Sequence, residues 1–283
     1  PYLLTGEPLN LKFSQVDAIA AKLQFEHDGT LRVGAGLIYA MRHNANNGHT
    51  CLPKEKLLQS TARFLRVEPD RVSEGLGTLL TSGELKLREF EGTSYIYLPD
   101  LLLAEQDIAI HLRTLASYPT EPPKRLESNI RALEMGQGVV YAPLQKQAIQ
   151  MALSSRVMVL TGGPGTGKTT TVNAILSLYE SGGDQVALCA PTGRAAKRLS
   201  ELTGHKASTI HRLLEVDYSS GSLRFIHNAK NLLKYDVVIL DEVSMVDVKL
   251  FQSLLAALRP HCRLILVGDA DQLPSVGPGN ILS

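Results

Sequence analysis

The chain has 283 residues, of which 44% are hydrophobic and 20% are charged, and its net charge is +1. That balance is typical of a folded protein and argues against a disordered one. No apolar run approaches the roughly 20 residues of a membrane-spanning helix, and no signal peptide is indicated. Three widely spaced cysteines fit neither a disulfide framework nor a zinc site, so we expect a reduced, cytoplasmic setting.

The first 118 residues are predicted to form a mainly helical domain. Apolar residues recur at helical spacing over 13–23, 31–44, 53–65 and 70–80. Two alternating runs follow, 85–90 and 95–98, and the turn Glu91-Gly92 between them indicates a β-hairpin. Three helices and a hairpin is the order of a winged-helix unit. Such units bind DNA or serve as spacers, and the slightly acidic charge of this part leaves both interpretations open.

A proline-rich stretch from Tyr118 to Pro123 is the clearest break in the chain. We therefore place a domain boundary at residue 118, a linker over 119–140 and a second domain over 141–283. Continuous apolar runs in the second domain predict buried strands at 157–160, 186–189, 237–240 and 264–267. Because helical segments separate them, they predict an α/β fold with a parallel sheet, helices on both faces and a ligand site beyond the carboxyl ends of the strands.

The first of these strands leads into a complete phosphate-binding loop, Gly162 to Thr169. Its glycines let backbone N–H groups turn inward, and the helix that follows offers its N-terminus to the same anion. Lys168 is expected to reach the β- and γ-phosphates of ATP, and the Thr169 hydroxyl to ligate Mg²⁺. The expected nucleotide contacts are Gly163, Pro164, Gly165, Thr166, Gly167, Lys168, Thr169 and Thr170. The alternative, a chance glycine-rich turn, is disfavoured by the flanking strand and helix.

Polar residues also follow the third and fourth strands. Asp241 is expected to hold Mg²⁺, and Glu242 to accept a proton from the attacking water. The alternative is a helix-capping pair, a role that suits Asp247 better. After the fourth strand, Gln272 is a candidate sensor of the γ-phosphate, because an amide can hydrogen-bond both a phosphate and the attacking water.

Basic residues cluster between the second and third of these strands. They are Arg194, Lys197, Arg198, Lys206 and Arg212, with two histidines among them. Such a cluster can neutralise nucleic-acid phosphates, and a solvated helix face explains the same charges equally well.

Four stretches of the second domain resemble motifs I, Ia, II and III of superfamily 1 helicases. They are Gly162 to Thr169, Ala190 to Ala196, Asp241 to Asp247 and Gly268 to Gly279. The segments APTGRAAKRL, STIHRLL, DEVSMVD and GDADQLPSVGPGN are similar to the corresponding sequences of the RecD branch. That resemblance implies a RecA-like ATPase domain and movement from 5′ to 3′ on single-stranded DNA.

The resemblance also assigns roles to single residues. It implies that Gln145 reads adenine, and Gln147 is the alternative that fits the spacing less well. It further implies contacts to the DNA strand by Thr192, Arg194, Thr209 and His211. Hydroxyl, guanidinium and imidazole groups suit this role, because they donate to phosphates or stack on bases.

The front of the chain resembles the long, stand-alone RecD-like helicases of superfamily 1B rather than the short RecD subunit of a RecBCD complex. GHTCLPKEKLL and YIYLPDLLLAEQDIAIHL carry this likeness. LNLKFSQVDAIAAKL is similar to the closing half of a helix-hairpin-helix, a remnant that lacks the usual hairpin glycines.

The resemblance as a whole implies an ATP-dependent DNA helicase of repair or recombination. The chain starts without methionine and stops after motif III, so we expect a fragment that binds ATP, Mg²⁺ and single-stranded DNA but hydrolyses ATP weakly without the arginine fingers of later motifs. Single-strand-binding protein is a candidate partner, and a monomer is expected. Two alternatives remain, the helicase portion of a conjugative relaxase and a nucleotide-controlled DNA-binding module that does not translocate.

Overall fold

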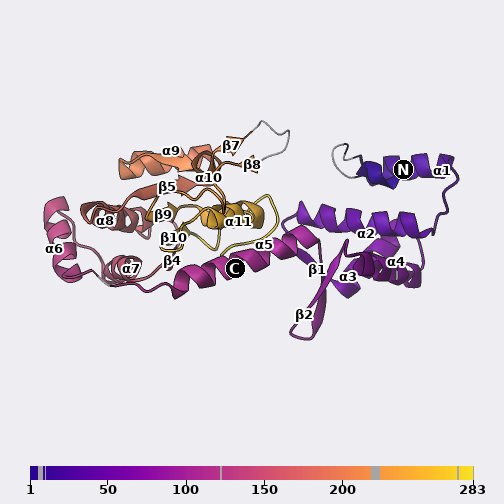
Figure 1. The fold of residues 1–283 in the computed structure, drawn as a ribbon, viewed down its shortest axis with the longest axis horizontal. Coiled ribbons are helices and arrows are strands. Elements are labelled where there is room, and N and C mark those ends of the chain that lie inside the picture. Colours follow the sequence, from indigo (N-terminus) through magenta and orange to yellow (C-terminus); the bar gives the residue numbers. More distant parts are fainter. Residues whose placement is uncertain (6–8, 10, 122, 218–223, 273, 283) are drawn as a thin grey trace. The chain divides into compact units, whose positions relative to one another are not determined.

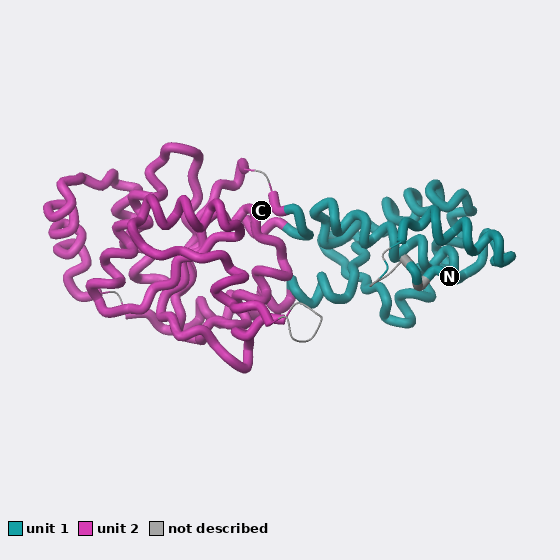
Figure 2. Tube along the Cα trace, turned by 90° about the horizontal axis from the view of Figure 1, so that it is seen from above, with its two compact units in different colours: residues 1–105, 276–279 teal, residues 106–275, 280–283 magenta. Residues whose placement is uncertain are grey.

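The computed structural model describes residues 1–283 except 6–8, 10, 122, 218–223, 273 and 283. Asn10, Pro122 and Leu273, which belong to the stretches quoted above, therefore lie outside the described residues. The described chain forms two compact units (Figure 2), residues 1–105 with 276–279 and residues 106–275 with 280–283. The division falls inside helix α5 (Pro99–Ser117) rather than at residue 118, because this helix runs without interruption from one unit into the other.

The first unit is mainly helical and carries a small sheet (Figure 1). Its helices are η1 (Tyr2–Thr5), α1 (Phe13–Lys22), α2 (Thr30–Ala45), α3 (Lys54–Leu65) and α4 (Pro69–Ser82). The strands β1 (Cys51–Pro53), β2 (Lys86–Phe90) and β3 (Thr93–Tyr97) pair antiparallel in the order β1-β3-β2. The predicted helices and hairpin are confirmed, and α2, α3, α4 and the hairpin follow one another as in a winged-helix unit.

An ion pair joins the first two long helices of this unit. The Arg32 guanidinium in α2 donates to both carboxylate oxygens of Asp17 in α1, at 2.7 and 2.8 Å. It also donates to the carbonyl oxygens of His27 and Leu65, at 2.8 and 3.0 Å. Arg32 is buried, and these four contacts satisfy a charge that would otherwise be costly to remove from water.

The second unit is built on a five-stranded parallel sheet. Its strands are β4 (Val157–Thr161), β5 (Val186–Ala190), β6 (Ala207–Thr209), β9 (Val237–Leu240) and β10 (Arg263–Gly268), in the order β4-β10-β9-β5-β6. The parallel α/β fold is confirmed, and so are the four predicted strands. The edge strand β6 was not predicted, because its three residues, Ala-Ser-Thr, form no apolar run.

Helices cover both faces of this sheet. One hydrophobic cluster packs the sheet against α6 (Leu126–Gln137), α7 (Pro143–Ser154), α8 (Lys168–Ser181) and α9 (Gly193–Thr203). The other holds α10 (Ile210–Leu214), α11 (Val248–Ala256) and the end of α5. Helix α6 lies inside the stretch 119–140, which the sequence pattern had indicated to be a linker. No helix within the described ranges is long and apolar enough to cross a membrane.

Short elements complete the second unit. Strands β7 (Val216–Asp217) and β8 (Arg224–Phe225) pair antiparallel, and η2 (Val243–Met245) is a single 3₁₀ turn after β9. Asp247 Oδ1 accepts the N–H of Leu250 at 2.9 Å and so caps α11. The expectation that Asp247 caps this helix, in place of the acidic pair before it, is confirmed.

Candidate nucleotide-binding site

The phosphate-binding loop connects the carboxyl end of β4 to α8. Gly165 and Gly167 have φ values of +76° and +83°, which glycine adopts without steric cost. Lys168 opens α8, and its Nζ donates to the carbonyl oxygens of Gly162 and Gly163, the second at 2.9 Å. A curled, glycine-rich backbone that ends in a helix N-terminus and carries an ammonium group fits a polyphosphate.

Asp241 and Glu242 follow β9 directly. The main-chain N–H of Glu242 donates to Asp241 Oδ1 at 2.9 Å, and Glu242 itself has left-handed φ and ψ of 55° and 42°. Burial raises the pKa of both carboxyls, and the charge of Asp241 raises that of Glu242 further. The charges of Lys168 and Arg198 act in the opposite direction on both. A partly buried carboxylate with a raised pKa suits the acceptance of a proton.

Sheet order brings these groups to one edge. Because β10 lies between β4 and β9, with Gly268 opposite Thr161 and Leu266 opposite Leu240, the residues after all three strands emerge together. A Cβ at Gly268 would lie 2.8 Å from Val243 Cγ1, so the chain after β10 passes close to the chain after β9.

The polar cluster after β10 adds a third acid to this edge. Asp269 is buried, its Oδ1 accepts the N–H of Asp271 at 3.1 Å, and its charge contributes to the raised pKa of Glu242. Gln272 is exposed, and its N–H donates to the Asp269 carbonyl oxygen at 3.3 Å. The sequence pattern indicated Gln272 and missed Asp269, whose signal was its place immediately after a buried strand.

Gln145 lies beside the phosphate loop. Its Oε1 accepts the N–H of Ala142 at 2.9 Å, and its Nε2 lies 3.4 Å from the carbonyl oxygen of Gly167. A Cβ at Gly167 would overlap Gln145 Nε2, so the amide fills the space that a side chain there would need. Gln147 is exposed on the same helix. The contacts of Gln145 with the loop favour it over Gln147 as the base-reading residue.

A magnesium ion needs few protein ligands in a phosphate site. Mg²⁺ prefers oxygen ligands, keeps several waters, and is held by one or two carboxylates together with the phosphates of the substrate. The Thr169 hydroxyl and the Asp241 carboxylate offer such a donor set. Within the described residues, no group of three or more His, Cys, Asp and Glu side chains could hold a metal by itself.

The residues that are candidates for DNA contact lie where β5 and β6 end. These two strands are parallel neighbours, and their last residues, Ala190 and Thr209, lie opposite each other. Thr192 Oγ1 accepts the N–H of Ala195 and so caps α9, at 3.2 Å. Thr209 Oγ1 caps α10 in the same way, through the N–H of Arg212. Both threonines therefore cap a helix, a structural role that the resemblance of the motifs alone did not reveal.

Arg194 and His211 lie in the two capped helices. Arg194 is exposed in the first turn of α9. The His211 ring is partly buried in α10, with its centroid 5.8 Å from that of Phe225 and a tilt of 57° between the planes. All four candidate DNA contacts thus lie at the carboxyl ends of β5 and β6 or just beyond them, at the edge of the sheet that also carries the phosphate loop.

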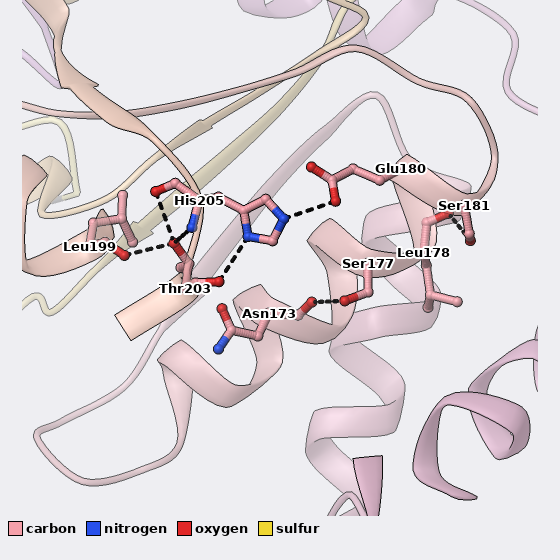
Figure 3. A network of polar contacts seen from close by, with 8 residues as sticks. All are labelled: Asn173, Ser177, Leu178, Glu180, Ser181, Leu199, Thr203 and His205. Carbon is pink, nitrogen blue, oxygen red and sulfur yellow. Dashed lines mark hydrogen bonds and ion pairs between the residues drawn. The ribbon is translucent and has the colours of Figure 1, made fainter. Parts of the chain in front are cut away.

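Polar contacts join α8 to the last turn of α9 and to the residues that follow it (Figure 3). His205 Nε2 lies 3.0 Å from Glu180 Oε2, and its Nδ1 lies 2.8 Å from the carbonyl oxygen of Thr203. Asn173 Nδ2 in α8 donates to the Leu202 carbonyl oxygen at 3.1 Å. Side chains therefore join the helix that follows the phosphate loop to the last turn of α9, the helix that carries Arg194, Lys197 and Arg198 of the basic cluster.

The sheet, the loop after β4 and the acidic pair after β9 define a RecA-like phosphate-loop NTPase fold. Residues 145–278 match the AAA domain family, and residues 1–51 match the family described as the ATP-dependent RecD2 DNA helicase HHH domain. This second match covers α1 and α2.

Curated relatives agree with these matches. The chain is 38% identical to the ATP-dependent RecD2 DNA helicase of Deinococcus radiodurans, over 89% of this chain and 36% of the relative. It is 44% identical to the RecBCD enzyme subunit RecD of Mycolicibacterium smegmatis, over 49% of this chain and 29% of the relative. The chain is thus similar to RecD-like helicases at both its front and its nucleotide-binding part, and it spans about a third of the length of these relatives.

Proposed function

We propose that this chain is the nucleotide-binding and DNA-binding part of an ATP-dependent helicase that moves 5′ to 3′ on single-stranded DNA during repair or recombination. The observation that carries the proposal is one sheet edge that bears the phosphate loop, the acidic pair and the exposed basic start of α9. The Deinococcus radiodurans relative is named an ATP-dependent DNA helicase, which supports both ligands. In this proposal the protein is a cytoplasmic monomer, and single-strand-binding protein is a candidate partner.

The nucleotide side uses four groups of this chain. Bound ATP with Mg²⁺ supplies the phosphoanhydride bond and the counter-charge that hydrolysis needs. Lys168 neutralises the phosphates, while the Thr169 hydroxyl and Asp241 hold the metal. Glu242 accepts the proton of the attacking water, and its raised pKa brings it nearer to the operating pH. Gln272 registers whether the γ-phosphate is present.

The DNA side uses the residues beyond β5 and β6. A threonine hydroxyl that accepts a helix N–H still has its own proton to donate, so Thr192 and Thr209 can cap their helices and donate to DNA phosphates at once. Arg194 supplies charge, and His211 supplies a ring that stacks or donates. Because Asn173 and Glu180 join α8 to the end of α9, a shift of α8 on nucleotide binding would be passed to this edge.

Two binding measurements on the 283-residue chain test the proposal. Fluorescent ATP and a labelled single-stranded oligonucleotide are titrated separately into the wild type, Lys168→Ala and Arg194→Ala. Lys168→Ala should weaken ATP binding by about 100-fold, because a charge-assisted phosphate contact is lost, while DNA binding is retained. Arg194→Ala should weaken DNA binding and reduce its salt dependence, while ATP binding is retained.

Turnover and strand displacement separate the alternatives. The isolated chain should hydrolyse ATP weakly, and Lys168→Ala serves as the blank. A full-length protein that contains this chain should displace a strand with 5′ to 3′ polarity. ATP-dependent DNA binding without displacement would instead support a module that does not translocate. Wild-type ATP affinity in Lys168→Ala would contradict the nucleotide site itself.

A further inference from the structure

Helix α6 holds the start of α7 through three polar contacts. Glu134 Oε1 accepts the main-chain N–H of Tyr141 at 2.8 Å, and it lies 2.9 Å from Lys146 Nζ. Gln137 Oε1, one turn along α6, accepts the Tyr141 hydroxyl at 2.7 Å. The Glu134 side chain is only 12% exposed, so its contacts are shielded from water. The ammonium of Lys146 and the N–H of Tyr141 lower the pKa of Glu134, and the carboxylate therefore stays ionised at neutral pH.

The segment that Glu134 holds carries the candidate base-reading amide. Tyr141 is buried, and the N-cap of α7 that follows it is Ala142, whose side chain cannot cap a helix. Gln145, at the third position of α7, makes only the reciprocal half of a capping box: its Oε1 accepts the Ala142 N–H, which leaves its amide nitrogen towards Gly167. The orientation of the amide thus depends on the position of the 141–142 backbone, and Glu134 holds the first of these two residues.

We infer that Glu134 is a positioning residue for recognition of the nucleotide base, acting on Gln145 through the backbone at 141–142. A side-chain amide has two N–H donors and an oxygen with two lone pairs, so Gln145 can keep its contacts with Ala142 and Gly167 and still offer one acceptor and one donor to a base. These match the amino group and N7 of adenine, whereas guanine presents two acceptors, O6 and N7. Which base is preferred therefore depends on how firmly the amide is held. The inference rests on the proposed nucleotide site and adds base selection from a helix outside it.

Glu134 lies outside the part of the chain that carries the recognised nucleotide-binding motifs. It lies before the residues 145–278 that match the AAA domain, and inside the stretch 119–140 that the sequence indicated to be a linker. Its two partners, Tyr141 and Lys146, stand on either side of Gln145 and its capping partner Ala142. A helix that served only as a spacer would need no ionised, shielded carboxylate directed at this segment.

Competition binding on the full 283-residue chain tests the inference. Fluorescent ATP is displaced by unlabelled ATP, GTP or inorganic tripolyphosphate. In Glu134→Ala, the affinity for ATP should fall about tenfold, the loss expected for one oriented hydrogen bond, while the affinities for GTP and tripolyphosphate stay unchanged. Glu134→Gln keeps an acceptor for the Tyr141 N–H and should retain most of the preference for ATP. Glu127→Ala is the matched control, because Glu127 lies on α6 and pairs only loosely with Arg131, at 3.9 Å.

The outcomes distinguish positioning from folding. An unchanged ratio of ATP to GTP affinity in Glu134→Ala would overturn the inference, and so would no preference for ATP in the wild type. An equal loss for ATP, GTP and tripolyphosphate, together with a lower melting temperature, would show a purely structural role and would overturn it as well. If Lys168→Ala binds ATP as the wild type does, the proposed nucleotide site fails, and that result is independent of Glu134.

Discussion

Replacing Glu242 by glycine should stabilise the second unit and abolish ATP turnover. The left-handed backbone of Glu242, with φ of 55°, costs a residue with a Cβ about 1–2 kcal/mol. Its carboxylate is also partly buried beside Asp241, and burial followed by this like charge raises its pKa. Both features are unfavourable for folding, and residues in such conformations concentrate at functional sites.

Comparison of Glu242→Ala with Glu242→Gly isolates the backbone contribution. Both variants remove the carboxylate and keep the main-chain N–H that donates to Asp241 Oδ1 at 2.9 Å. Glycine relieves about 1–2 kcal/mol of steric cost but gives up about 0.4–1 kcal/mol through the greater freedom of its unfolded chain. The glycine variant should therefore be more stable than the alanine variant by about 1 kcal/mol, or about 2–4 °C in melting temperature.

Urea unfolding and thermal melting at pH 7 measure this difference, and steady-state ATP turnover is measured on the same samples. A glycine variant less stable than the alanine variant would refute the left-handed backbone assignment. Turnover at the wild-type level in either variant would show that Glu242 is not the proton acceptor. A stabilising effect of both variants relative to the wild type would identify the buried carboxylate as the second unfavourable feature.

Three further changes have defined outcomes. Gly167→Ala should weaken ATP binding about tenfold or more, because the new Cβ overlaps Gln145 Nε2 at a φ of +83°; unaltered affinity in the same titration would contradict the loop geometry. Turnover should fall as the pH drops, with a midpoint above the ordinary glutamate value of 4.5, since burial raises the pKa of Glu242; a midpoint at or below 4.5 in the pH–rate profile would exclude Glu242 as the base. Asp17→Asn should destabilise the first unit by about 2 kcal/mol at pH 7, less than for a fully buried pair because Asp17 is 28% exposed. Arg32 lowers the pKa of Asp17, so the contribution of this ion pair to the free energy of unfolding is complete above pH 3.8, the ordinary aspartate value, and is lost as the pH falls further. Urea unfolding of Asp17→Asn should therefore lack this acid-dependent loss of stability.

Local patterns in the sequence were sufficient for most helices and strands and for the chemistry of the nucleotide site. Apolar spacing located α1 to α4, the hairpin, and strands β4, β5, β9 and β10, because periodicity is a property of neighbouring residues. The phosphate loop was recognisable for the same reason, since its glycines, Lys168 and Thr169 act within one turn of chain. Asp241 and Glu242 were predicted from their position after a buried strand.

Long-range contacts decided the rest. The place of β10 between β4 and β9, which brings Asp269 towards the acidic pair, depends on strand pairing between residues more than a hundred positions apart in the chain. The role of α6 was hidden because its carboxylate acts on a different helix, and a proline-rich start made the segment resemble a linker. The capping roles of Thr192 and Thr209 were also invisible to motif similarity, because a hydroxyl that suits DNA equally suits a helix N–H. The sequence by itself determined which groups could act on a nucleotide, since each works through its immediate neighbours; only the tertiary structure decided which groups meet and what holds them, since that depends on the packing of distant segments.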